Sequence, residues 1–168
     1  MLQDRCVAQD LIAAASDAFL ILKQHDLRVV TAESCTAGLI AACLSQAESA
    51  ADLLEGSFVT YTKAQKTKAL GIAPELLAER SAVHGEVACA MARGALTHSQ
   101  ADIALAVTGV LGPSRDEDGN PVGLVYMSCL RRGGRPAVRR YDYGAQPHDV
   151  LRNRVVCDAL GLLKDCAR

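Results

Sequence analysis

The chain has 168 residues, 50% of them hydrophobic, and a formal net charge of −1. This length is enough for one well-filled core and too short for two ordinary domains, so we expect a single domain over residues 1–168. The near-neutral charge excludes a global basic field for nucleic acid or an anionic membrane. The aromatic content of 4% argues against a base-stacking platform.

The seven cysteines are odd in number, and most lie within apolar runs. That pattern favours reduced, core-filling thiols over a disulfide framework. Neither Cys-x-x-Cys nor His-Glu-x-x-His occurs, so we expect no metal and no organic cofactor. The first ten residues lack the layout of a secretory signal, and no apolar run reaches membrane-spanning length. We therefore expect a cytoplasmic protein.

Helical patterns alternate with short apolar runs along the chain. In chain order the sequence predicts a helix over 4–25, a strand over 27–31, a helix over 35–46, a strand over 56–61, a helical turn over 62–70, a helix over 85–99, a strand over 102–108, a loop over 109–121, strands over 122–130 and 138–143, and a helix over 150–164. The order predicts an α/β fold, specifically a three-layer α/β/α sandwich with a mixed sheet.

Ser34 follows the first predicted strand, where small polar residues open the next predicted helix. Backbone N–H groups at a helix start have no intrahelical partner. A serine there can cap the helix, and its hydroxyl can also attack a carbonyl whose oxyanion those N–H groups hold. On the pattern alone, capping by Ser34 or Thr36 is the more common outcome. Cys35 is the rival nucleophile, although free cysteines are usually small buried apolar residues.

A serine nucleophile needs a base. The four histidines form no recognisable triad pattern, which leaves lysine as the other candidate. Lys63 and Lys66 lie one helical turn apart after the second predicted strand, and Tyr61 stands at the end of that strand. Burial or a neighbouring cation lowers the pKa of a lysine enough for it to act as a base. The alternative is an ordinary solvated basic face.

Six segments in this order and spacing resemble the nicotinamide-nucleotide amidase family, the CinA C-terminal domain. They are Glu33-Ser34-Cys35-Thr36, Phe58-Val59-Thr60-Tyr61 with Lys66, Leu70-Gly71-Ile72, Ala106-Val107-Thr108-Gly109, Gly112-Pro113 and Pro121-Val122-Gly123. The resemblance implies a hydrolase that converts nicotinamide mononucleotide to nicotinic acid mononucleotide and ammonia. It also implies a homo-oligomer.

By position, the resemblance makes Ser34 the nucleophile, Lys66 the base and Tyr61 a proton-relay or orienting group. The partner is then a small pyridine nucleotide. We expect the nucleotide to contact the residues that follow Ser34, and also the strand that includes Thr108 with the loop after it. Arg115, in that loop, is a side chain able to bind a phosphate. The full set of expected substrate-binding residues is Cys35, Thr36, Gly38, Thr108, Gly109, Gly112 and Arg115.

The chain departs from the family at several points. Ala37 replaces a glycine, which is tolerable if the position is helical, and Lys63 to Gln65 replace an Asn-Glu-Ala run. Residues 114–118, three of which are acidic, replace the glycine-rich loop of the family. Gln146 stands where the family tends to have an arginine near the last strand. We expect weak turnover of nicotinamide mononucleotide, or a preference for a different or less phosphorylated amide. The alternatives are neutral loop changes, or a non-catalytic nucleotide-binding or regulatory relative. The cluster of arginines over 131–140 has two interpretations: it forms an anion-binding patch, or its members are ordinary solvated charges.

Overall fold

The computed structural model describes the backbone of residues 2–48 and 50–168, with side chains from residue 9 onward. The strands are β1 (Val29–Glu33), β2 (Leu54–Val59), β3 (Ile103–Gly109), β4 (Leu124–Arg131) and β5 (Ala137–Asp142). The helices are α1 (Leu2–Gln24), α2 (Leu39–Leu44), α3 (Ala50–Leu53), α4 (Lys63–Leu70), α5 (Pro74–Arg80), α6 (Gly85–Thr97) and α7 (His148–Ala167). No helix in these ranges is long and apolar enough to cross a membrane.

The five strands form one mixed sheet in the order β2-β1-β3-β4-β5. β2, β1 and β3 run parallel, whereas β4 and β5 are antiparallel additions. Glu33, the last residue of β1, pairs with Val59 of β2 and Val107 of β3. The carboxyl ends of the three parallel strands therefore meet at one edge, where α/β proteins commonly bind ligands.

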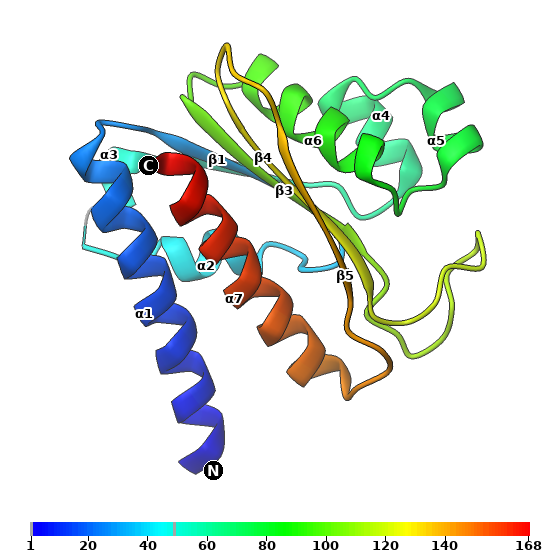
Figure 1. Cartoon of the computed structure of the whole chain (residues 1–168), viewed down its shortest axis with the longest axis horizontal. Helices are drawn as coiled ribbons and strands as arrows, with labels where there is room; N and C mark the ends of the chain where they lie inside the picture. The colour runs from blue at the N-terminus through cyan, green and yellow to red at the C-terminus, as the bar shows by residue number, and fades with distance from the viewer. Residues whose placement is uncertain (1, 49) are drawn as a thin grey trace.

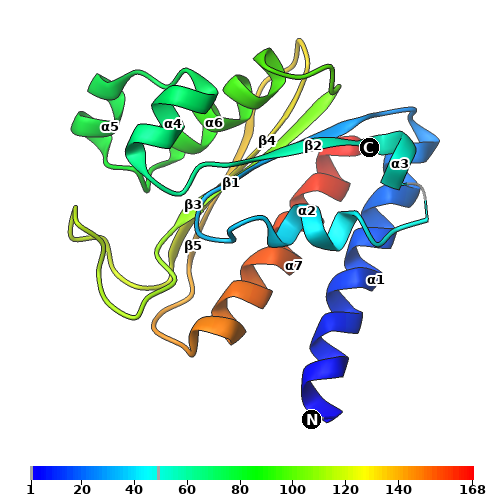
Figure 2. The same ribbon diagram turned by 180° about the vertical axis from the view of Figure 1, so that it is seen from behind.

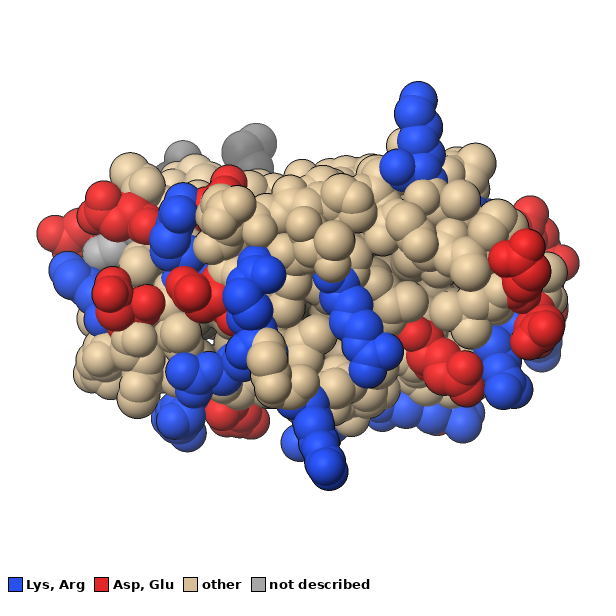
Figure 3. Space-filling view, turned by 90° about the horizontal axis from the view of Figure 1, so that it is seen from above, with Lys and Arg blue, Asp and Glu red and all other residues tan. Residues whose placement is uncertain are grey.

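Helices cover both faces of the sheet, which confirms the predicted three-layer α/β/α sandwich (Figures 1 and 2). Side chains along β3 alternate between two cores, as the period of two in a strand requires. Leu105 packs with the face covered by α1, α2 and α7, and Ala104 packs with the α4–α6 face. Figure 3 shows Lys and Arg interspersed with Asp and Glu on the face seen from above, with no broad area of one sign.

Most predicted elements are present within a few residues of their expected bounds. Two short helices, α3 and α5, had no sequence signal that we recognised. α5 begins at Pro74, whose fixed φ suits the first helical turn and whose missing N–H has no intrahelical role there. The helix expected over 35–46 is wrong at its start, because α2 begins only at Leu39.

Candidate active site

A buried carboxylate fixes the turn that follows β1. Glu33 is fully buried, and it accepts hydrogen bonds from three backbone N–H groups and two hydroxyls. The donors are Gly38 N (3.0 Å), Ile40 N (3.1 Å), Ala41 N (2.8 Å), Thr36 Oγ1 (2.7 Å) and Thr31 Oγ1 (3.2 Å). A buried carboxylate needs such partners. Glu33 therefore holds the turn in a single conformation.

The geometry of this turn corrects two expectations. Ala37 has φ 52° and Gly38 has φ 93°, so both lie in the left-handed region and the expected helical conformation of Ala37 is wrong. The N–H groups at the start of α2 are occupied by Glu33, so they do not face a substrate. Ser34 does not cap this helix, because Gly38 is its N-cap.

Ser34 and Lys66 meet at the carboxyl edge of the parallel strands. The Lys66 Nζ donates to Ser34 Oγ (2.8 Å) and to the Thr60 carbonyl oxygen (2.8 Å). The two side chains come from the turn after β1 and from α4, whose N-cap Thr62 accepts from Gln65 N. Ser34 is 7% exposed and Lys66 is 1% exposed, so the lysine head group is directed inward, not into solvent.

Burial sets the protonation of the candidate base Lys66 and of the rival nucleophile Cys35. It lowers the pKa of Lys66 to about 8, because the charged ammonium loses its hydration. Burial also raises the pKa of the Cys35 thiol to about 12, so Cys35 is protonated at neutral pH. A thiol is a poor nucleophile compared with its thiolate. Burial thus brings the neutral, basic form of Lys66 within reach near pH 8 and disfavours Cys35 as the attacking group.

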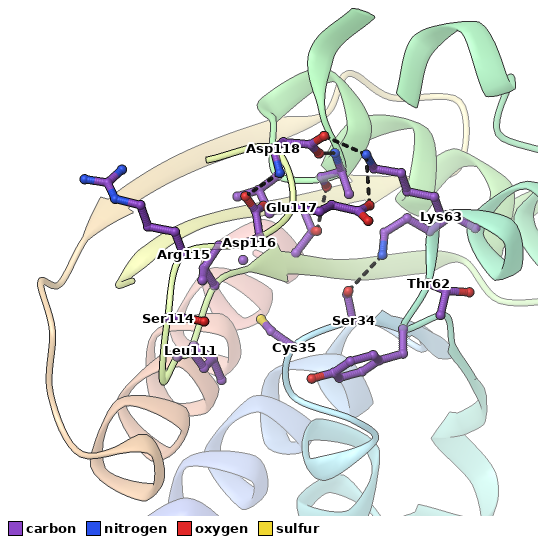
Figure 4. Close-up of a pocket in the computed structure, with 18 of the residues that line it drawn as sticks. Ser34, Cys35, Thr62, Lys63, Leu111, Ser114, Arg115, Asp116, Glu117 and Asp118 are labelled. Atoms are coloured by element: carbon purple, nitrogen blue, oxygen red, sulfur yellow. Dashed lines mark hydrogen bonds and ion pairs between the residues drawn. The ribbon is translucent and has the colours of Figure 1, made fainter. Parts of the chain in front are cut away.

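The serine–lysine pair opens into a pocket of about 400 Å³ (Figure 4). The predicted site residues that line it are Ser34, Cys35, Tyr61, Lys66, Thr108, Gly109, Gly112 and Arg115. Thr36 and Gly38 do not line it, and both donate to Glu33 instead. Thr108 donates its hydroxyl to the Ala82 carbonyl (2.7 Å) and so fixes the 81–84 segment beside the pocket.

Tyr61 and Arg115 are less engaged than expected. The Tyr61 residue is 67% exposed, and among the described residues its hydroxyl makes no hydrogen bond with Ser34 or Lys66. Arg115 donates to the carbonyl oxygen of Gly119 in its own loop (2.7 Å). Figure 4 shows its guanidinium extending away from Ser34.

Sequence reasoning gave no role to Glu33 or to the Thr60 carbonyl. The available signal for Glu33 was a carboxylate at the end of a run of apolar strand residues, where an unpartnered charge is costly. The Thr60 carbonyl is a backbone group and leaves no sequence signal. Across the described residues, no cluster of three or more His, Cys, Asp or Glu side chains could hold a metal ion.

The fold and the site define an α/β protein with a buried serine–lysine pair at the carboxyl edge of its parallel strands. The family model for the CinA C-terminal domain matches residues 12–167, and the chain belongs to that family. A CinA-like protein from Geobacter sulfurreducens is 36% identical over 92% of this chain, and one from Citrifermentans bemidjiense is 44% identical over 86%. The chain spans only 38% and 34% of those two relatives.

Solved structures give the same family. The competence/damage inducible protein CihA from Agrobacterium tumefaciens matches with a TM-score of 0.90 and 35% identity, over 95% of this chain and 96% of that one. A CinA superfamily protein from Escherichia coli matches with a TM-score of 0.87 and 34% identity, over 93% of this chain and 91% of that one. These relatives are named for the family and not for a reaction.

Proposed function

We propose that this chain is an amidohydrolase that releases ammonia from the carboxamide of a nicotinamide nucleotide. The observation that carries the proposal is the 2.8 Å hydrogen bond between Lys66 Nζ and Ser34 Oγ at the base of a pocket. A nucleophile and base within hydrogen-bond reach, with the base held by a third group, is the arrangement that activated serines use. Here the third group is the Thr60 carbonyl.

In the proposed reaction, neutral Lys66 accepts the Ser34 proton as Oγ attacks the carboxamide carbon. The lysine then passes that proton to the leaving nitrogen, the C–N bond breaks and ammonia departs. A water molecule gives a proton to Lys66 and attacks the resulting ester. The carboxylic acid leaves and Ser34 regains its proton. Atoms and charges balance without a metal or an organic cofactor.

The oxyanion needs donors other than the start of α2, whose N–H groups bind Glu33. The N–H groups of Cys35 and Thr36 donate to no carbonyl or carboxylate oxygen within the described residues. The Cys35 N–H follows the nucleophile directly, which is the position of one oxyanion donor in hydrolases with a nucleophile elbow, and the Thr36 N–H is next to it. We assign the oxyanion to these two groups.

The rival hypothesis is a non-catalytic nucleotide-binding or regulatory relative, and a Lys66 side chain that pointed into solvent would favour it. The buried lysine supports the hydrolase instead. The free cysteines among the described residues fit a reducing compartment, so we extend the proposal to a cytoplasmic protein.

The test is ammonia release from a panel of pyridine nucleotides, run with the parent chain and with Ser34→Ala. Ammonia from at least one nucleotide, absent in the variant, supports the proposal. A folded parent chain that releases none from any member contradicts it.

A further inference from the structure

Two charged segments, the first turn of α4 and the 114–118 loop, meet across the mouth of the pocket. Lys63, on the first turn of α4, donates to Asp118 (2.7 Å) and lies 3.0 Å from a Glu117 carboxylate oxygen. The dashed lines in Figure 4 join these three side chains above Ser34. All of them line the pocket. The lysine on α4 is therefore the partner of two of the three acids in the 114–118 loop.

The ion pairs leave Lys63 little free charge for a substrate. The hydrogen bond with Asp118 raises the pKa of Lys63 and lowers that of Asp118, so both stay ionised at neutral pH. Asp118 also accepts from Ala82 N (3.4 Å), which anchors the loop to the segment that Thr108 holds. The loop and α4 are thereby linked across the opening.

The remaining charges at the mouth do not favour an anion. Asp116 accepts from Asn120 Nδ2 (2.8 Å) and from two backbone N–H groups, and has no cationic partner within the described residues. Arg115 is turned to Gly119. At the mouth, three carboxylates thus lie beside two cations: Lys63 is doubly paired, and Arg115 extends away from Ser34. The third cation of the pocket, Lys66, is buried at its base.

We propose that the Lys63–Asp118–Glu117 ion-pair cluster makes this pocket select a cationic, N-substituted pyridinium carboxamide without a phosphate over its phosphorylated form. The proposal rests on the proposed function and names its substrate class. A pyridinium ring carries a positive charge that the carboxylates at the mouth attract. A phosphate would meet the same carboxylates, and it would have to displace two of them to reach Lys63.

The direct test converts the acids to amides. The double variant Asp118→Asn, Glu117→Gln frees Lys63 from its two ion pairs. The control is Asp142→Asn, which removes one acidic charge from an ion pair with Arg140 on β5, away from the pocket lining. kcat/KM is measured on nicotinamide riboside and on nicotinamide mononucleotide at low ionic strength. The parent should favour the riboside by about threefold or more, which is the scale of partly exposed charge pairs.

The double variant should reverse that ratio or bring it near one, and Asp142→Asn should leave it unchanged. Raising the salt concentration should narrow the parent's preference, because exposed charges are screened. A parent that prefers the mononucleotide, or a ratio unaltered in the double variant, would overturn the proposal. Thermal unfolding of each variant verifies that it is folded.

Binding to Ser34→Ala separates this proposal from the proposed reaction. The same two ligands are titrated into Ser34→Ala with and without the amide substitutions. If Ser34→Ala binds the riboside more tightly and the amide substitutions abolish that preference, charge selection is supported. This holds even where no chain releases ammonia, because the absence of ammonia would contradict only the proposed reaction. Equal affinities that the substitutions do not alter, or binding of neither ligand, would overturn charge selection.

Discussion

The Lys66 Nζ lies 2.8 Å from Ser34 Oγ, although the two residues are 32 positions apart in sequence. The turn after β1 supplies the serine, and α4, which follows β2, supplies the lysine. Both segments therefore begin near the carboxyl end of a parallel strand. Two backbone hydrogen bonds keep these strand ends in register, Ser34 N to the Val107 carbonyl (3.0 Å) and Thr60 N to the Glu33 carbonyl (2.8 Å). The pair is thus positioned by the sheet.

Ser34→Ala should reduce amide hydrolysis by about 10³-fold or more, because the nucleophile is lost. Its far-ultraviolet circular dichroism and unfolding midpoint should match the parent, since only one side-chain hydrogen bond disappears. Cys35→Ala should lose far less activity, because the thiol is buried and protonated. Loss confined to Cys35→Ala would move the nucleophile to Cys35.

Lys66→Met should lower kcat by about 10²- to 10⁴-fold, the usual range for a general base. Lys63→Met should lose much less, because Lys63 Nζ binds the loop carboxylates and not Ser34. Steady-state kinetics on one amide substrate measure both variants. The reverse ranking would show that Lys66 is not the base.

The unfolding temperature of Lys66→Met shows whether its loss of activity comes from the missing base or from a loss of folding. Below pH 8 the lysine is protonated in both the folded and the unfolded chain, and the fold carries the cost of burying the ammonium. That cost declines as the pH rises from about 8 toward the ordinary lysine value. Lys66→Met should therefore unfold at a temperature no lower than the parent at pH 7, with the difference shrinking at higher pH.

The pH dependence of kcat/KM should follow the same titration. Neutral lysine is the active form, and its fraction increases as pH rises through about 8. We predict an ascending limb with an apparent pKa near 8 and a plateau above it, measured between pH 6 and 10 on a substrate that does not titrate there. A profile that is flat or falling between pH 7 and 9 would contradict Lys66 as the base.

The sequence predicted the sandwich and the Ser34–Lys66 pairing for different reasons. Hydrophobic periodicity reports burial, so the strand over 102–108 could be placed within a residue of β3. The pairing came from resemblance, because spacing along the chain does not reveal which side chains meet. The late start of α2 was missed, since it depends on the Glu33 carboxylate binding backbone N–H groups seven and eight positions further on, and these groups carry no sequence signal.

The Lys63 ion pairs were missed for a similar reason. Lys63 and Asp118 are 55 positions apart, and their meeting depends on how the 112–120 loop folds over α4. The sequence showed a basic turn and an acidic loop and gave no basis for pairing them. The predicted phosphate contact of Arg115 likewise assumed a direction that the loop does not adopt.

We predict that the chain self-associates into a dimer or larger oligomer. Half of its residues are hydrophobic, and apolar side chains such as Leu20 (60% exposed) and Val150 (48% exposed) remain on the surface. β5 is an edge strand of the described sheet, with Val138 partly exposed on it. Light scattering at micromolar concentration should report a mass above that of one chain. A monomer would contradict the prediction.

The final prediction concerns the left-handed backbone of Ala37. An alanine there has φ 52° and is exposed, so its Cβ gains little packing to offset the steric cost of about 1–2 kcal/mol. Glycine avoids that cost but loses about 0.5–1 kcal/mol through the greater freedom of the unfolded chain. Ala37→Gly should therefore raise the free energy of unfolding by about 0.5–1 kcal/mol.

Two matched variants decide whether the backbone angle is the cause. Ala42→Gly makes the same change at an exposed position within α2 and should destabilise the fold by about 0.5–1 kcal/mol. Gly38→Ala adds a methyl group at φ 93°, with its Cβ 3.3 Å from the Val59 side chain, and should destabilise it as well. Urea unfolding gives all three free energies. Equal destabilisation by Ala37→Gly and Ala42→Gly would mean that the turn carries no strain at Ala37, and that Glu33 holds it without conformational cost.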